Sequence, residues 1–122
     1  MAIKSFKELT VWQRAMELVG TIYEMSGQLP AKEQYALISQ MIRAVISIPS
    51  NIAEGWARNH KIEFIRYLSI AYGSACELET QLTISKKQYS NIDYSQADNL
   101  LDEVQKMLTV LMKKLKNHEQ NW

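Results

Sequence analysis

The chain has 122 residues, of which 47% are hydrophobic and 22% charged, and 14 basic against 13 acidic residues give a formal net charge of +1. This length suits one domain, residues 1–122, and the apolar fraction excludes a disordered chain. The near-neutral balance gives no support for a dedicated nucleic-acid module, because such modules are usually strongly basic. The single cysteine, Cys76, excludes an intrachain disulfide.

The first predicted helix runs from about residue 9 to residue 26. Gly27 and Pro30 end it, because glycine favours a helix C-terminus and proline does not continue a helix. Apolar residues at spacings of three and four predict one core-facing stripe: Leu9, Trp12, Met16, Val19 and Tyr23. The second predicted helix covers about residues 31–57, since Pro30 and Glu33 suit a helix N-terminus.

The third predicted helix covers about residues 61–89 and the fourth about residues 94–116, with Asp93 as N-cap of the fourth. Their core-facing stripes are Ile65, Leu68, Tyr72, Ala75, Leu78 and Leu82, and then Ala97, Leu101, Val104, Leu108, Leu111 and Leu115. Short loops make consecutive helices antiparallel neighbours. The sequence therefore predicts an all-α fold, an antiparallel up-down-up-down four-helix bundle.

Pro49 falls in the middle of the second predicted helix. The apolar stripe of that helix is Ile38, Ile42, Val45, Ile48, Ile52 and Trp56. An interior proline removes a backbone hydrogen bond and clashes with the preceding turn, at a cost of about 3 kcal/mol. We therefore predict a proline-kinked second helix, in which Ser50 or Asn51 bonds the carbonyls that Pro49 leaves free.

A polar stripe follows the same spacing on the second helix: Gln40, Arg43, Ser47, Asn51 and Glu54. If the second and third helices turn about Asn59, their residues face each other in reverse order. Ser47 then lies opposite Ala71, and Arg43 lies within one turn of Glu77. We therefore expect an ion pair between Arg43 and Glu77, in a network that also contains Gln40 and Gln81.

The polar stripe has three interpretations. With Pro49, Gly73 and Glu77 it forms a register-fixing network and subunit contact, a ligand or catalytic pocket, or a solvated face. Gly73 favours the first, because a mid-helix glycine costs about 1 kcal/mol and small residues let helices approach closely. Glu54 opposes the dipole of its helix end, so we expect it to pair with Arg58 four residues later.

The sequence carries no recognisable catalytic or metal motif. Neither His60 nor His118 follows a glutamate by three residues, as a di-iron bundle requires. Two histidines and one cysteine do not make a typical zinc site. We therefore interpret the chain as non-enzymatic, without catalytic residues, cofactor or metal. A small nuclease that uses Glu54 or Glu77 is the less favoured alternative.

Basic residues cluster at two places. They are Arg58, His60, Lys61 and Arg66 at the junction of the second and third helices, and Lys106, Lys113, Lys114 and Lys116 on the fourth helix. They form either a solvated face or a phosphate-contacting patch, whose field an oligomer would multiply. Neither a signal-peptide core nor an apolar run of membrane length is present, so we expect a cytoplasmic protein without a membrane partner.

Several motifs resemble those of the 23S rRNA intervening-sequence proteins, a family often called four helix bundle proteins. The most specific is Ser47-Ile-Pro-Ser-Asn-Ile-Ala-Glu-Gly55. The others are Phe6, Leu9-Thr-Val-Trp-Gln-Arg-Ala15, Pro30, Glu33, Tyr35, Gln40, Arg43-Ala44, Glu63-Phe64, Leu68, Ala71-Tyr-Gly-Ser74 and Glu77-Leu-Glu79. The match spans about residues 6 to 116.

This resemblance implies a bacterial protein that assembles as a ring-shaped homopentamer. Some members are encoded inside segments inserted in large-subunit rRNA genes, and similar accessory proteins of diversity-generating retroelements bind nucleic acid through a basic barrel. We therefore expect a homo-oligomeric adaptor for RNA, DNA or a nucleic-acid enzyme; the alternative is a protein-interaction module without nucleic-acid binding. Trp12, Trp56 and Tyr67 are the large residues suited to a subunit interface.

Overall fold

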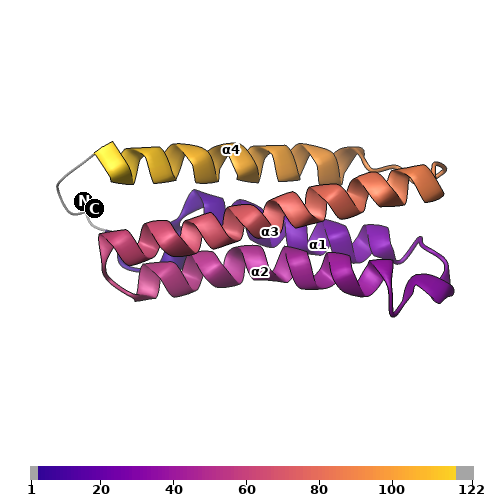
Figure 1. Ribbon diagram of the computed structural model, residues 1–122, viewed down its shortest axis with the longest axis horizontal. Helices are drawn as coiled ribbons and strands as arrows, with labels where there is room; N and C mark the ends of the chain where they lie inside the picture. Colours follow the sequence, from indigo (N-terminus) through magenta and orange to yellow (C-terminus); the bar gives the residue numbers. More distant parts are fainter. Residues whose placement is uncertain (1–2, 118–122) are drawn as a thin grey trace.

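The computed structural model describes residues 3–117, which form four long α-helices and, within this range, no strand. The helices are α1 (Thr10–Ser26), α2 (Leu37–Ala57), α3 (Lys61–Gln88) and α4 (Ser95–Asn117), with short 3-10 turns η1 (Phe6–Glu8) and η2 (Ala31–Glu33). Figure 1 shows the helices side by side along the long axis, with the chain reversing direction at each connection. The all-α four-helix fold is therefore confirmed.

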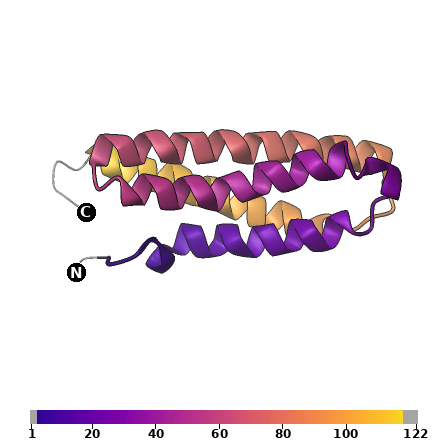
Figure 2. The same ribbon diagram turned by 90° about the horizontal axis from the view of Figure 1, so that it is seen from below.

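Each helix packs against its two neighbours around the bundle. α1 and α3 both contact α2 and α4, and the α2–α3 contact is the most extensive. Figure 2 shows the same arrangement from below, with η1 at the end where α2 turns into α3. The fully buried large side chains come from all four helices: Leu18, Ile22, Met41, Val45, Ile48, Ile52, Phe64, Leu68, Leu78, Leu82, Val104 and Leu108.

The helix bounds agree with the sequence prediction to within one residue, except at the start of α2. This helix begins at Leu37, six residues later than the predicted residue 31. Ala36 breaks the helix with a φ of −123° and a ψ of −100°. Tyr35 beside it is 94% exposed, so this part of the connection buries nothing that would hold it in a helix. Glu33 instead accepts a hydrogen bond from Tyr89 Oη at 2.5 Å.

The predicted core stripe of α1 was wrong in part: Leu9 is buried and Trp12 and Val19 pack half-buried against the core, but Met16 and Tyr23 are exposed. The buried residues of α1 include Val11, Ala15, Leu18, Ile22 and Met25. Met16 is 45% exposed and Tyr23 is 55% exposed. The helix carries two adjacent apolar stripes, and the one without Met16 and Tyr23 faces the core most directly. Met16 and Tyr23 of the second stripe therefore remain on the surface.

Pro49 lies inside α2 and is buried, and the helix continues through it. The bend at Pro49 stays a prediction. Asn51 Nδ2 donates to the carbonyl oxygen of Ser47 at 2.8 Å. It does not reach the carbonyl of Val45, which is the one that an N–H at position 49 would have bonded. In residues 3–117, no helix is long and apolar enough to cross a membrane.

Candidate nucleic-acid interface

Three segments meet at one end of the bundle, where α2 turns into α3, α4 ends and the described chain begins (Figures 1 and 2). We call residues 3–10, 54–66 and 110–117 the basic end. It contains eight Lys and Arg residues: Lys4, Lys7, Arg58, Lys61, Arg66, Lys113, Lys114 and Lys116. Its carboxylates are three, Glu8, Glu54 and Glu63, whereas the other described residues contain six cations and nine carboxylates. The fold thus separates charge along the bundle.

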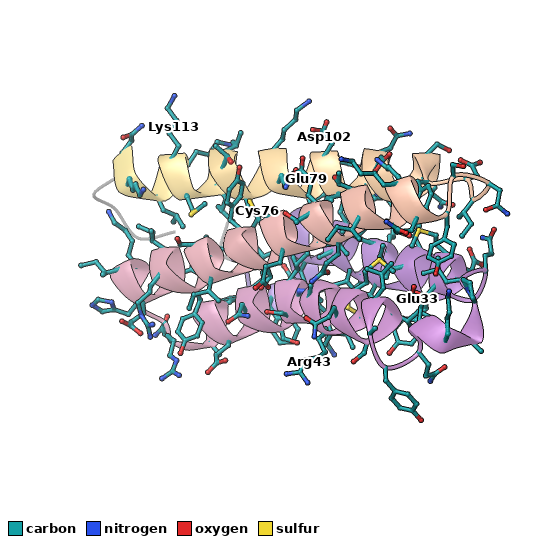
Figure 3. All side chains as sticks on the ribbon, turned by 45° about the vertical axis from the view of Figure 1, so that its right-hand side comes forward. Glu33, Arg43, Cys76, Glu79, Asp102 and Lys113 are labelled. Carbon is teal, nitrogen blue, oxygen red and sulfur yellow. The ribbon has the colours of Figure 1, made fainter. Side chains whose placement is uncertain are left out.

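The two predicted basic clusters on either side of this end are far apart in the sequence. The fold brings Arg58, Lys61 and Arg66 to the same end as Lys113 and Lys114, and Figure 3 shows Lys113 on the outside of α4. Lys106 lies further along α4, where it pairs with Asp102 at 2.9 Å. The sequence analysis did not include Lys4 and Lys7 among the candidates, although their place before the first helix puts them at this end.

The α2–α3 turn is built by two polar residues. Asn59 has a φ of 53°, a left-handed conformation that asparagine tolerates better than most residues. His60 is the N-cap of α3, and its Nδ1 accepts from the backbone N–H of Glu63 at 3.4 Å. This capping bond gives His60 a structural role at the junction.

Two arginines flank the buried ring of Tyr67. Arg58 donates to Glu54 at 3.0 Å, which confirms the predicted pair, and to Tyr67 Oη at 2.8 Å. Arg66 pairs with Glu63 at 3.3 Å. The guanidinium carbons lie 5.2 Å and 4.7 Å from the centre of the Tyr67 ring, within cation–π range. The result is a fixed pair of cations at the basic end.

These contacts also stabilise the charged form of the two arginines. The hydrogen bond to Glu54, followed by the field of Tyr67, raises the pKa of Arg58 above its ordinary value. The hydrogen bond to Glu63 does the same to the pKa of Arg66. Both side chains remain about half exposed, so their unused N–H groups face solvent. A solvent-facing guanidinium is a good donor to phosphate oxygens.

The predicted ion pair between Arg43 and Glu77 was wrong. Both residues are exposed, and no ion pair among the described residues joins them. Figure 3 shows Arg43 pointing away from the bundle on the outside of α2. Gln40 is exposed too, so the network proposed around this pair does not form within one chain. The physical reason is the orientation of α2, which places Arg43 on its outer side.

A smaller network joins α2 to α3 further along the polar stripe, at Ser47 and Asn51. The hydroxyls of Ser47 and Ser74 lie 2.7 Å apart, and Asn51 Nδ2 donates to Ser47 Oγ at 2.9 Å. Ser47 therefore faces Ser74 rather than the predicted Ala71. This contact joins the two helices at one point, and the register-fixing role of the stripe stays a prediction.

The close approach between α2 and α3 occurs at Gly55, not at the predicted Gly73. A Cβ added to Gly55 would lie 2.6 Å from Cβ of Tyr67 and 3.0 Å from Cδ1 of Phe64. A Cβ added to Gly73 would meet no atom within 4 Å. Gly73 is exposed on α3 and does not mediate helix packing within the monomer.

An apolar surface lies along the groove between α1 and α2. It surrounds a cavity of about 340 Å³, and we call its residues the apolar face: Trp12, Met16, Val19, Ile46, Pro49, Ser50 and Ala53. Met16 is 45% exposed and Ile46 is 40% exposed. The second apolar stripe of α1 supplies Trp12, Met16 and Val19, three of the seven residues of this face.

The described residues contain no group of three or more His, Cys, Asp or Glu side chains that could hold a metal ion. Glu54, a candidate catalytic carboxylate, is engaged by Arg58 and lies 3.4 Å from Tyr67 Oη. Glu77, the other candidate, is exposed on α3. The fold does not bring these two carboxylates together with a second candidate catalytic group.

Comparison with known proteins decides the family. Residues 7–110 match the family described as 23S rRNA-intervening sequence protein. The chain belongs to this family. It is also similar in structure to a protein of unknown function from the S23 ribosomal protein family of Bacteroides thetaiotaomicron, with a TM-score of 0.77 and 23% identity over 85% of this chain and 99% of that chain. At this identity the likeness shows the fold. Among curated proteins, no sequence matches this chain.

Proposed function

We infer that this member of the 23S rRNA-intervening sequence family is a non-enzymatic, self-associating bundle that binds nucleic acid through its basic end. The observation that carries the proposal is the gathering of eight cations against three carboxylates at one end of a chain whose net charge is only +1. Phosphate contacts supply a large share of nucleic-acid affinity, and they depend on local rather than total charge.

Two parts of the basic end support phosphate contact in different ways. Arg58 and Arg66 are held against Tyr67, so little side-chain freedom remains to be lost when they meet a phosphate. Lys113, Lys114 and Lys116 belong to no ion pair among residues 3–117, so they are available as mobile counter-charges. A fixed pair orients the backbone, and the lysines add long-range attraction.

The apolar face supports self-association. Trp12, Met16 and Ile46 lie around one cavity on the surface of a small chain that has already filled its core. Aromatic residues and methionine are enriched where protein interfaces form. A second copy of the chain that covers this face would bring further basic ends together and strengthen their combined field.

The decisive experiment is a binding titration of a labelled RNA pool at several salt concentrations. Lys113→Glu with Lys114→Glu should lower affinity and reduce the slope of log K against log salt by about two, since each lost phosphate contact lowers it by about one. The pair Lys61→Gln with Arg66→Gln tests the other side of the basic end in the same way. Lys32→Glu with Lys87→Glu is the matched control at the opposite end.

The proposal fails if the Lys113/Lys114 variant and the Lys32/Lys87 control bind alike, or if the wild-type chain does not bind at low salt. RNA that is shortened during the titration would contradict the non-enzymatic part and would favour the nuclease alternative. Circular dichroism of each variant guards against unfolding as the cause of a loss.

Self-association has its own test by light scattering. Ile46→Glu should lower the solution mass toward the 14.1 kDa of one chain, because it places a charge in the apolar face. Ile84→Glu is the matched control, since Ile84 is 46% exposed but lies outside that face. Equal masses for the two variants would place the interface elsewhere.

A protein-interaction module without nucleic-acid contact is the second candidate, and the apolar face is the observation that favours it. A chain that self-associates normally but does not bind RNA at any salt concentration would favour this second function over the first.

A further inference from the structure

A pocket of about 370 Å³ opens at the basic end, between the start of the described chain and the last turn of α2. Its lining residues are Lys4, Ser5, Phe6, Trp56, Ala57 and Asn59. This volume falls within the range of small-ligand sites, roughly 300 to 1,000 Å³. We call it the corner pocket.

We propose that the corner pocket binds one unpaired nucleobase of the nucleic acid that the basic end contacts. The inference rests on the proposed function and narrows it to single-stranded or bulged nucleic acid. It assigns the pocket to a base, and the surrounding cations to the phosphates on either side of that base.

The aromatic rings of Phe6 and Trp56 supply the surface on which a base would stack. The ring of Phe6 is held by the ring of Trp12, which it meets edge-on with centroids 5.3 Å apart. Both Phe6 and Trp56 are half-buried, so each keeps part of its surface accessible. Stacking on aromatic side chains is the usual way in which proteins bind single-stranded nucleic acid.

The polar groups of the corner pocket suit the edge of a base. Asn59 offers an amide donor and acceptor, the combination that pairs with base edges. The φ of 53° at Asn59 fixes the backbone that carries this amide. Ser5 Oγ already accepts from the backbone N–H of Lys7 at 3.1 Å, which leaves its hydroxyl hydrogen free to donate to a ligand.

The charges around the corner pocket suit a phosphodiester more than a neutral ligand. Lys4 is part of the lining, and Arg58 and Lys61 lie within two residues of Asn59 along the chain. A nucleotide within a strand can stack its base on the aromatic walls and place its phosphates near these cations. A free apolar ligand would use only the walls.

The test compares two probes of equal charge by fluorescence anisotropy: an eight-residue oligouridylate and an eight-unit abasic phosphodiester. If a base enters the corner pocket, the wild-type chain binds the oligouridylate at least fivefold more tightly. Asn59→Gly should reduce this ratio, because it removes the amide that contacts the base edge. Glycine adopts the positive φ without strain, so this variant keeps the turn. Asn91→Gly, an exposed asparagine near the opposite end, is the matched control and should keep the ratio.

Each outcome of this test supports or overturns the base site. Equal affinity for the two probes overturns the base site and leaves phosphate binding by the basic end intact. A ratio that is unchanged in Asn59→Gly also overturns the base site, because Asn59 then does not contact the base. If neither probe binds, both this inference and the proposed nucleic-acid function fall.

Discussion

Gly55 of α2 faces Tyr67 of α3 so closely that a methyl group on Gly55 would lie 2.6 Å from Cβ of Tyr67. Two carbon atoms do not approach this closely without a clash. The clashing atom is Cβ of Tyr67, which is bonded directly to the α3 backbone, so it cannot move without the helix. The Glu54–Arg58–Tyr67 contacts lie directly beside this point. The glycine therefore sets the spacing of the two helices at the basic end.

Gly55→Ala should destabilise the bundle by about 1–3 kcal/mol, because the added methyl forces α2 and α3 apart. Urea unfolding measures the change. Gly20→Ala is the matched control, since a Cβ at Gly20 in α1 would meet nothing within 4 Å. A Gly55→Ala variant as stable as the wild type would show that the helices are not in close contact there.

Gly73→Ala should stabilise the bundle by about 0.5–1 kcal/mol, because alanine is the better helix former and the site is open. The same unfolding assay applies. A loss of stability would mean that another chain covers Gly73, and light scattering on the variant would then show a lower mass.

Tyr67→Phe should lower stability by about 1 kcal/mol. The change keeps the ring between the two arginines and removes the hydroxyl that accepts from Arg58 at 2.8 Å. Thermal unfolding of this variant, compared with Tyr35→Phe at a 94% exposed position, isolates the effect of the Tyr67 hydroxyl and its contacts with Arg58 and Glu54. Equal losses in the two variants would remove the energetic role of this contact.

The connection before α2 predicts a pH effect. Tyr89 Oη donates to Glu33, and this hydrogen bond, followed by desolvation, raises the pKa of Tyr89 above its ordinary value of 10.0. A raised folded-state pKa means that the native state holds its proton more tightly than the unfolded state does. The stabilisation is therefore complete below about pH 10 and is lost as pH rises through the folded-state pKa.

Tyr89→Phe should remove this part of the loss of stability at alkaline pH. Unfolding midpoints measured between about pH 9 and 11, the range around the ordinary tyrosine pKa, test this. The pKa of Tyr89 can also be followed by spectroscopy, as the tyrosinate absorbance of the wild type minus that of the variant at each pH. If that difference titrates below the ordinary tyrosine pKa, Glu33 does not hold the Tyr89 proton.

The helical period of the sequence was sufficient to predict three helices to within a residue, but it did not determine how each helix is rotated. On α1, two apolar stripes satisfy the same period, and the choice of Met16 and Tyr23 as core residues was wrong. Which stripe is buried depends on the neighbouring helices, which no local pattern encodes. The same ambiguity leaves an apolar face on the surface.

The register between α2 and α3 was the other error. A turn centred on Asn59 places Ser47 opposite Ala71, whereas its partner in the structure, Ser74, lies three residues further along α3. The two helices are therefore offset by nearly one turn, and this offset depends on the backbone of a short connection. The Arg43–Glu77 pair failed for a different reason, because α2 is rotated so that Arg43 lies exposed on its outer side. The local Glu54–Arg58 pair, which needs only helix geometry, was predicted correctly.

The basic end could be derived from the sequence only in two steps. Composition alone argued against a nucleic-acid module, because cations and carboxylates nearly cancel over the whole chain. The antiparallel order of the helices is what places the α2–α3 turn beside the end of α4 (Figure 1). Charge separation of this kind appears once local sequence is combined with topology.

We propose that the protein self-associates and binds nucleic acid electrostatically. Light scattering of the protein alone and with an RNA pool, at low and at moderate salt, tests both parts in one experiment. The account predicts a mass that is a multiple of 14.1 kDa, and a complex with RNA that forms at low salt and dissociates at moderate salt. A single chain of 14.1 kDa that RNA leaves unchanged at both salt concentrations would contradict it.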